Sequence, residues 1–425
     1  MGSALLVETA QALSDRLTSE GMSGPPRSIA RVPLPLHPRA DAGFGVLDVT
    51  EWFGETSGGI RTYLLEKANY VASRPWLRHT VVVPGLRDRI TDADGVRLYR
   101  LAGPPIPGQR PYRFMLATRT LTRIVRHERP DVIEVGSPFI VPWIVKRATR
   151  ESHLPLVYFS HTNVPRMFAP AEGAGNPLQR LLYRGSSEYL RRLDRLFDLT
   201  IVASDYTARE LVRVGVDRVV KVPLGVDVEC FTPTRRESVT ETRARFGLPD
   251  APLAAFVGRF AREKELHVVL DGWRDVERRC GARLALVGAG PMEAALRAHP
   301  YGHRVTFVPF VKEREALADL LASIDVYVAA GPIETFGLSA IEALASGTPI
   351  LSVNEGAVVE HVEGSGAGRI YERRQGASVS EVAVQLFADD PGELGARGRA
   401  YAVAEHAWET VFDRLFAVYR TVRGA

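Results

Sequence analysis

The sequence predicts an α/β protein with two domains. A chain of 425 residues is longer than a single ordinary hydrophobic core requires. Short apolar segments, typical of buried parallel strands, alternate with segments of helical periodicity, and this alternation begins twice, near residues 45 and 252. We therefore expect two domains, each with a parallel sheet that carries helices on both faces.

The composition is that of a soluble globular protein, with 45% hydrophobic and 24% charged residues. No apolar run reaches the roughly eighteen residues that a membrane span requires, and the first residues lack the basic leader of a secretory signal, so we expect a cytoplasmic protein. A net charge of +4 gives no reason to expect a nucleic-acid partner. Two cysteines are too few for a disulfide framework or a thiolate metal site.

Residues 1–42 are expected to form an N-terminal extension and a linker. Residues 3–19 have the apolar spacing of a short amphipathic helix, and a Pro-rich segment follows them. A poorly ordered extension and a helix that docks on a membrane surface or a partner are both compatible with this pattern.

The first domain is expected over residues 43–235. Gly58 and Gly59 lie between the first strand and a helix, where backbone N–H groups can hold an anion, although flexible turns use the same residues. His161 directly follows a predicted strand, and ligands bind at the carboxyl ends of strands in open α/β sheets; a structural histidine is the alternative. The predicted strands are 45–50, 79–85, 97–102, 131–136, 155–160 and 199–204, with helices that include one near 112–127.

The second domain is expected over residues 236–404. Its first strand ends at Arg259, and Lys264 lies in the turn that follows. An Arg fork and a Lys point charge can both reach the same phosphates, although a charged surface turn has the same composition. The segment 284–291 has two glycines of a dinucleotide-binding turn, but Glu293 occupies the position of the third, which disfavours a nicotinamide oxidoreductase.

The segment 331–347 combines two carboxylates with a helix start. Glu334 is expected in a loop, and Glu342 lies eight positions later, inside a helix that opens at Phe336 and Gly337. This separation is roughly 12 Å along a helix axis, about the span from the sugar to the ribose of a nucleotide sugar. The helix start can hold a diphosphate without a metal, and the carboxylates can accept hydrogen bonds from hydroxyl groups. An ordinary amphipathic helix with two surface glutamates is the alternative.

This segment resembles the E-x7-E signature of the retaining glycosyltransferases of family 4, which have the GT-B fold. The matching residues are Glu334, Phe336, Gly337, Leu338 and Glu342, and the resemblance extends from about residue 44 to the C-terminus. It implies two Rossmann-like domains that face each other across a donor and acceptor cleft. It also implies that the C-terminal helix, within 405–425, returns to the first domain.

The resemblance implies a role for each candidate in the second domain. Arg259, Lys264 and the helix start at Phe336, Gly337 and Leu338 would bind the donor diphosphate. Glu334 would orient the sugar hydroxyls, Glu342 would hold the ribose, and the loop at Val311 would border the nucleobase.

The first domain would complete the site, with Gly58 and Gly59 facing the donor phosphate and His161 beside the transferred sugar. His161 and Glu334 are the catalytic candidates. The implied reaction retains the anomeric configuration and needs neither a metal nor a cofactor besides the nucleotide-sugar co-substrate. The D-x-D sequence of Asp92 and Asp94, which some glycosyltransferases use to bind a metal, precedes a glycine and is predicted to be a turn.

Two further segments bear on the donor and the acceptor. Residues 53–71 and the HTNVPR sequence at 161–166 look closest to bacterial mannosyltransferases that use GDP-mannose, including those that act on phosphatidylinositol mannosides. The basic amphipathic segment 178–197 fits a solvated helix face or contact with an acceptor or an anionic lipid, as on the inner face of the plasma membrane. A UDP-sugar-dependent transferase acting on a small metabolite and a non-catalytic sugar-nucleotide-binding protein remain alternatives.

Overall fold

The computed structural model describes residues 43–53, 59–93, 95–109, 112–168 and 177–424. These residues form two compact units. The first unit contains the residues up to Ala203, together with Ala208–Val222 and the C-terminal segment from Phe412. The second unit contains Ser204–Thr207 and Pro223–Val411.

The boundaries between the two units differ from those expected from the sequence. The second unit starts at Pro223, whereas the second domain was expected from residue 236, and the C-terminal segment of the first unit starts at Phe412 instead of 405. The expected N-terminal extension, with its helix at 3–19, lies outside the described residues, and so do Gly58 and Asp94.

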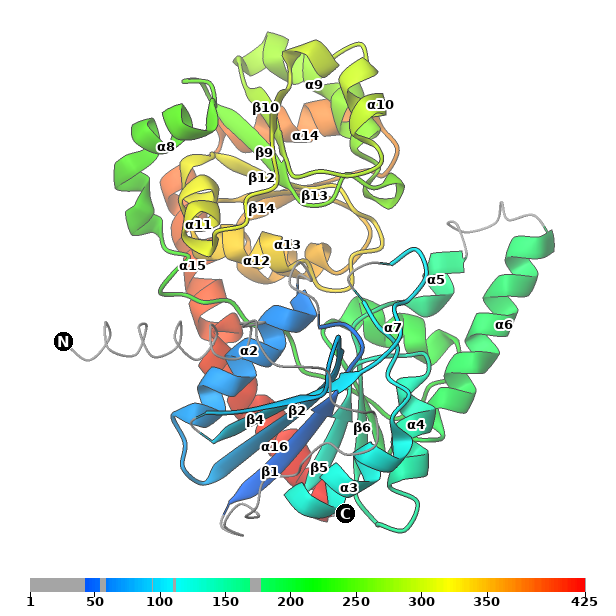
Figure 1. Cartoon of the computed structure of the whole chain (residues 1–425). Coiled ribbons are helices and arrows are strands. Elements are labelled where there is room, and N and C mark those ends of the chain that lie inside the picture. Colours follow the sequence, from blue (N-terminus) through cyan, green and yellow to red (C-terminus); the bar gives the residue numbers. More distant parts are fainter. Residues whose placement is uncertain (1–42, 54–58, 94, 110–111, 169–176, 425) are drawn as a thin grey trace. The chain divides into compact units, whose positions relative to one another are not determined.

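The described part of the first unit contains an eight-stranded sheet with the order β3-β4-β2-β1-β5-β6-β7-β8 (Figure 1). All neighbouring strands are parallel except β3 and β4, which are antiparallel. The strands are β1 (Phe44–Val49), β2 (Leu77–Gly85), β3 (Arg89–Ala93), β4 (Val96–Ala102), β5 (Val132–Val135), β6 (Leu156–Ser160), β7 (Leu199–Val202) and β8 (Val219–Lys221).

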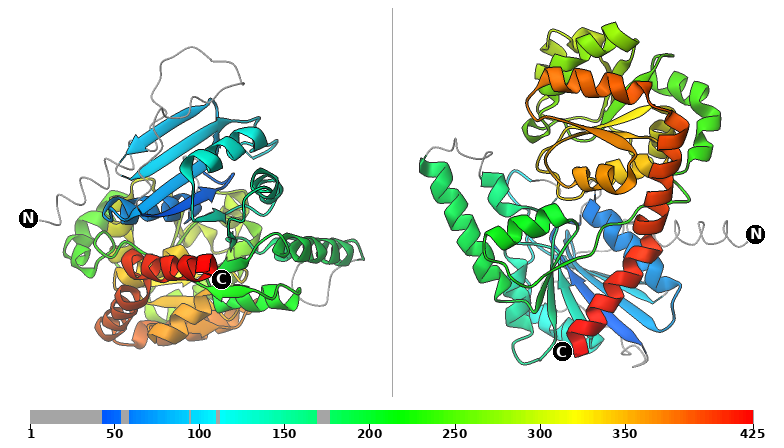
Figure 2. Two further views of the ribbon diagram at one scale, coloured as in Figure 1. Left: turned by 90° about the horizontal axis from the view of Figure 1, so that it is seen from below. Right: turned by 180° about the vertical axis from the view of Figure 1, so that it is seen from behind.

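Helices cover both faces of this sheet, as the apolar strand runs predict. Helices α2 and α16 pack together through aromatic side chains, and Figure 2 shows α16 and α3 on opposite faces of the sheet. The helices are α2 (Gly59–Ala72), α3 (Thr118–Glu128), α4 (Val141–Ala148), α5 (Val164–Phe168), α6 (Pro177–Asp194), α7 (Asp205–Arg213) and α16 (Trp408–Gly424).

Two predictions in the first unit were wrong. The helix expected near 112–127 begins only at Thr118. Asp92 lies within the edge strand β3 and not in a turn. Its carboxylate accepts a 2.8 Å hydrogen bond from Nε of Arg97 on the neighbouring strand, so Asp92 and the buried Glu128, 2.8 Å from Nη1, both pair with a largely buried guanidinium.

The second unit has a six-stranded parallel sheet with the order β11-β10-β9-β12-β13-β14. Renumbered from β9, this is the 3-2-1-4-5-6 order of a Rossmann sheet, and the order reverses between β9 and β12. The strands are β9 (Leu253–Val257), β10 (Arg283–Val287), β11 (Thr306–Val308), β12 (Val326–Ala329), β13 (Ile350–Val353) and β14 (Gly368–Tyr371).

Helices flank this sheet as well, with α9 and α14 on one face and α12 and α13 on the other (Figure 1). None of the helices in the described ranges has the length and apolar character of a membrane span. The elements are α8 (Val239–Phe246), α9 (Leu266–Cys280), α10 (Glu293–Ala298), α11 (Arg314–Ser323), α12 (Leu338–Ala345), α13 (Val358–Ser365), α14 (Gly376–Ala388), α15 (Pro391–His406) and the 3-10 turns η1 (Pro233–Ser238), η2 (Arg262–Lys264) and η3 (Gly302–Arg304).

Candidate functional site

The central pair of the candidate site lies at the carboxyl ends of β9 and β12, where the strand order of the second unit reverses. Ligands bind at such points in open α/β sheets. The turn η2 after β9 carries Lys264, and the loop after β12 carries Glu334. Their side chains form an ion pair in which Lys264 Nζ donates to Glu334 Oε2. The structure thus brings together two residues that are seventy positions apart in the sequence.

The ion pair is accessible to solvent, because the side chains of Lys264 and Glu334 are 22% and 31% exposed. Gly331 makes room for it: a Cβ atom there would lie 3.3 Å from Lys264 Nζ and 3.6 Å from Glu334 Oε2. A cation and a carboxylate at one solvent-accessible point can bind the phosphate and the hydroxyl groups of one ligand.

Arg259, the other predicted phosphate ligand, has a different partner. Its exposed guanidinium forms an ion pair of 2.6 Å with Glu263, which the sequence analysis did not single out. Gly258, before Arg259, packs closely against the turn after β10: a Cβ on Gly288 would lie 2.1 Å from the Gly258 carbonyl oxygen. The glycines of segment 284–291 therefore have a packing role next to β9.

Helix α12 begins at Leu338 and not at Phe336, which corrects the prediction. Gly337 has φ of +88°, a left-handed conformation outside the helix, and a Cβ there would lie 2.5 Å from Val358 Cγ2. Phe336 is buried, its ring lies 4.9 Å from that of His361, and its carbonyl oxygen lies 2.9 Å from His361 Nε2. Any contact of Phe336 with a ligand would therefore involve its backbone.

Glu342 lies within α12 and is buried. Burial raises the pKa of its carboxyl to about 7; Arg314 acts in the opposite direction, and Asp227 adds to the rise. Hydrogen bonds from the hydroxyl groups of a ligand would favour the ionised carboxylate. Among the described residues this buried carboxyl has no ion pair, so it is suited to accept hydrogen bonds from a ribose.

Two other predicted donor ligands occupy positions that solvent can reach. Leu338, the first residue of α12, and Val311, in the loop between β11 and α11, are both half-buried. The neighbouring Phe310 is exposed, with 63% of its surface accessible. An exposed aromatic side chain beside Val311 offers a stacking surface for a planar ring.

In the first unit, Gly59 is the first residue of α2, and Gly58 lies outside the described residues. His161 directly follows β6, and its ring stacks on Phe159 with centroids 4.2 Å apart. Burial, together with the nearby Lys67, lowers the pKa of His161 to about 3, so its imidazole is neutral at pH 7. A neutral imidazole can donate one hydrogen bond and accept another.

A buried charged cluster in the first unit was missed by the sequence analysis. Lys67 of α2 is fully buried, and its Nζ lies 3.0 Å from Asp48 Oδ1, 3.5 Å from Glu134 Oε2 and 2.7 Å from Tyr419 Oη. Tyr63 Oη also accepts a hydrogen bond of 3.2 Å from Nζ, and His79 forms a hydrogen bond with the other oxygen of Asp48. The signals in the sequence were a lysine on the otherwise apolar face of the predicted helix and an acidic residue inside each of two predicted strands, 45–50 and 131–136.

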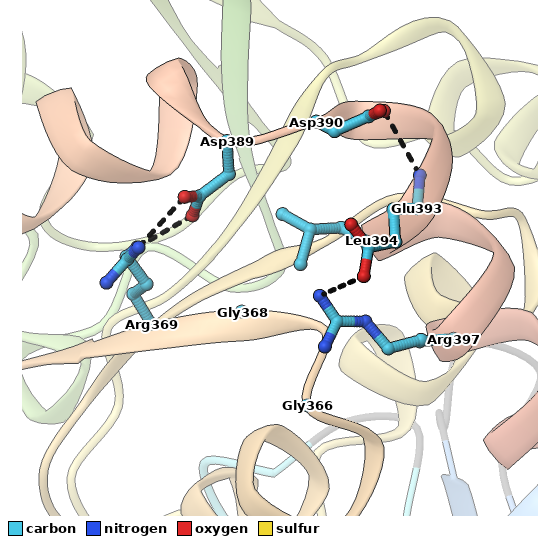
Figure 3. Close-up of a pocket in the computed structure, with 8 residues that line it drawn as sticks. All are labelled: Gly366, Gly368, Arg369, Asp389, Asp390, Glu393, Leu394 and Arg397. Carbon is cyan, nitrogen blue, oxygen red and sulfur yellow. Dashed lines mark hydrogen bonds and ion pairs between the residues drawn. The ribbon is translucent and has the colours of Figure 1, made fainter.

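A polar pocket of about 270 Å³ lies elsewhere in the second unit, beside the amino end of β14 (Figure 3). Its charged groups pair with one another: Arg369 forms two hydrogen bonds with Asp389, and Arg397 lies 3.4 Å from Glu393. It is lined by Gly366, Gly368, Arg369, Asp389, Asp390, Glu393, Leu394 and Arg397, and contains no predicted donor ligand.

Comparison with known families and proteins agrees with the resemblance. Residues 57–230 match the model of Glycosyltransferase Family 4, and residues 251–389 match that of Glycosyl transferases group 1. The chain is 33% identical, over 323 residues, to a GDP-mannose-dependent alpha-(1-6)-phosphatidylinositol dimannoside mannosyltransferase of Mycobacterium tuberculosis, covering 74% of this chain and 81% of that protein. It is 31% identical to a GDP-mannose-dependent alpha-mannosyltransferase of the same species, covering 78% and 83%.

Solved structures show the same fold at lower identity. A sucrose-phosphate synthase from Thermosynechococcus elongatus matches with a TM-score of 0.72 and 21% identity, covering 90% of this chain and 99% of that one. HepE of Anabaena, in complex with UDP and glucose, matches with a TM-score of 0.67 and 15% identity, covering 88% and 99%. These likenesses confirm the predicted GT-B fold.

Proposed function

Since the chain belongs to glycosyltransferase family 4 and is a glycosyltransferase that uses a nucleotide sugar, we propose that it transfers mannose from GDP-mannose to an acceptor hydroxyl with retention of configuration. The similar proteins named as GDP-mannose-dependent support this choice of donor. For the acceptor we propose a glycolipid such as a phosphatidylinositol mannoside, the class that the first of these names contains.

The observation that carries the donor proposal is the ion pair of Lys264 and Glu334 at the switch point of the second sheet. A diphosphate oxygen that binds Lys264 would replace Glu334 as its partner. The released carboxylate could then accept hydrogen bonds from the hydroxyl groups of the sugar. In the same way, Arg259 would exchange Glu263 for the diphosphate.

We propose that no metal takes part. The departing nucleoside diphosphate gains negative charge as the glycosidic bond breaks, and Lys264, Arg259 and the start of α12 can stabilise that charge. For a retaining reaction we propose same-face attack, with the departing phosphate helping to deprotonate the acceptor. The role of His161 beside the sugar stays a prediction.

A thermal-shift comparison tests the donor site. GDP should stabilise the wild-type protein, by about 2.7 kcal/mol at 100 times its dissociation constant, more than UDP, ADP or NAD at the same concentration. Lys264→Ala should lose most of this shift, whereas Lys146→Ala, at an exposed lysine of α4, should keep it. A larger melting-temperature shift with UDP than with GDP would indicate that the donor is a UDP-sugar and not GDP-mannose. If no nucleotide shifts the melting temperature, the donor site itself is wrong.

The start of α6 supports contact with an anionic membrane surface, where a lipid-linked acceptor would reside. Leu178 and Leu181 are 60% and 66% exposed, and Leu182 is also exposed. Arg180 and Arg184 are exposed on the same helix. Exposed apolar side chains next to basic ones are typical of helices that lie on anionic lipid surfaces.

Replacing Leu178 and Leu181 together by Glu should weaken binding to vesicles that contain anionic lipid by about tenfold or more, because apolar burial and charge attraction both decrease. Co-sedimentation measures this. Val403→Glu, at an exposed apolar position of α15 in the second unit, is the control and should bind as the wild type does. Equal binding of the double variant would exclude α6 as the contact, and equal binding of the wild type to neutral vesicles would exclude the charge preference.

A further inference from the structure

The backbone directly after Lys264 has a conformation that is unusual for a residue with a side chain. Glu265 has φ of 45° and ψ of 34°, in the left-handed region. It ends the turn η2 and precedes α9, and it is one of three non-glycine residues with positive φ in the described part of the chain. The Cβ atom makes this conformation costly, and glycine is the residue that usually adopts it. Something must therefore hold Glu265 in place.

Arg373, which follows β14 by two residues, supplies the shortest side-chain contacts that restrain Glu265, and Nε of the neighbouring Arg374 lies 3.5 Å from the same carboxylate. Nη2 and Nε of Arg373 donate hydrogen bonds of 2.6 and 3.0 Å to the two carboxylate oxygens of Glu265. The side chains of Arg373 and Glu265 are only 12% and 15% exposed, so water screens this ion pair less than one on the surface. A two-pronged contact fixes the direction of the Glu265 side chain, and with it the backbone.

Arg373 is itself fixed from the other side. Its Nη1 donates a 2.7 Å hydrogen bond to Glu355, and its backbone N–H donates one of 3.1 Å to Asn354 Oδ1. The guanidinium is thus shared between two carboxylates, and its position is set independently of Lys264. Arg373 can therefore influence Lys264 through the backbone of Glu265, the residue that directly follows Lys264.

We propose that Arg373 is a positioning residue of the donor site. By holding Glu265 in its left-handed conformation, it keeps the turn η2 in the shape that presents Lys264 to the donor diphosphate. This inference rests on the donor site proposed above. It adds that a residue 109 positions after Lys264 in the sequence controls nucleotide affinity without touching the nucleotide.

A glycine at position 265 provides the test, because glycine adopts the left-handed conformation without help. Arg373→Ala should weaken GDP binding, measured by calorimetry, about tenfold, the order of the cost of a left-handed residue. The double variant Glu265→Gly/Arg373→Ala should bind GDP within about threefold of the wild type. In steady-state assays the loss in Arg373→Ala should appear in KM for the nucleotide sugar more than in kcat.

The matched control is Arg369→Ala, which removes an arginine paired with a carboxylate, Asp389, near the other end of β14. It should leave GDP affinity unchanged. The inference is overturned if Arg373→Ala binds GDP as the wild type does, or if glycine at 265 restores none of the lost affinity. If Arg373→Ala does not fold, Arg373→Lys can replace it in the same comparison, with and without Glu265→Gly. Lysine keeps the positive charge but cannot form the two parallel hydrogen bonds of a guanidinium.

Lys264→Ala separates this inference from the donor site on which it rests. If Lys264→Ala keeps full GDP affinity, the donor site is wrong and the effect of Arg373 needs another cause. If Lys264→Ala loses affinity while Arg373→Ala does not, the donor site stands and only the positioning role fails.

Discussion

Replacing Glu334 by Gln should lower kcat/KM for sugar transfer by about 10² to 10³-fold. A carboxylate that accepts hydrogen bonds from sugar hydroxyls contributes more than a neutral amide, since hydrogen bonds to charged groups are worth about 1.5–3 kcal/mol each. The amide also has the same shape, so the loop after β12 should keep its conformation. Initial rates with GDP-mannose and a glycolipid acceptor measure the loss.

The same variant should bind GDP at least as tightly as the wild type. Glu334 competes with the diphosphate for Lys264, because the two side chains form an ion pair without ligand. Removing the negative charge removes this competition. Opposite effects on transfer and on nucleotide affinity would distinguish a site residue from one that only stabilises the fold.

Glu363→Gln, at an exposed glutamate of α13, is the control and should change neither quantity. Transfer by Glu334→Gln within twofold of the wild type would refute the role of Glu334. A wild-type protein that binds GDP but neither transfers nor hydrolyses GDP-mannose would be a binding protein, not a transferase.

The parts of the site that lie within one short sequence segment could be predicted from the sequence. The segment around Glu334 and Glu342 and the turn with Lys264 each follow a recognisable strand, and parallel strands bring their carboxyl ends to one edge of a sheet. Which carboxylate pairs with which cation was not predictable. The pairs of Arg259 with Glu263 and of Glu265 with Arg373 depend on side-chain rotamers and on one left-handed residue.

The alternation of apolar strands and helices predicted most of the fold as well, since buried parallel strands have a strong apolar signal. It failed for β3, an edge strand of only five residues, RITDA, whose polar sequence resembles a turn. It also failed for the buried cluster around Lys67. Asp48 and Glu134 are directly opposite each other on β1 and β5, a register that the sequence alone does not give.

Replacing Lys67 by Met should lower the free energy of unfolding by about 3–5 kcal/mol, the range for removing one partner from a buried ion pair. Lys67 is the cation between Asp48 and Glu134, and without it the ionised carboxylate of Asp48 would lose its lysine partner in a dry site. The variant also loses the hydrogen bond from Nζ to Tyr419, which ties α16 to α2. Urea unfolding measures the effect, and Lys146→Met, at an exposed position, should change stability by less than about 0.5 kcal/mol.

The pH dependence of unfolding gives a second test of this cluster. Burial opposes ionisation of Asp48, but Lys67 and His79 outweigh it and lower its pKa, so Asp48 keeps the charge that balances Lys67. Burial, and then repulsion from Asp48, raises the pKa of Glu134 from 4.5 to about 8, against the attraction of Lys67. The folded protein therefore holds this proton more tightly than the unfolded chain does, and its stability should fall as pH rises from about 4.5 to 8.

Glu134→Gln keeps the hydrogen-bonding shape without the titrating proton, so its stability should depend less on pH in that window than that of the wild type. A loss below about 1 kcal/mol in Lys67→Met would contradict the view that Lys67 is needed to keep the ionised carboxylate of Asp48 in the core.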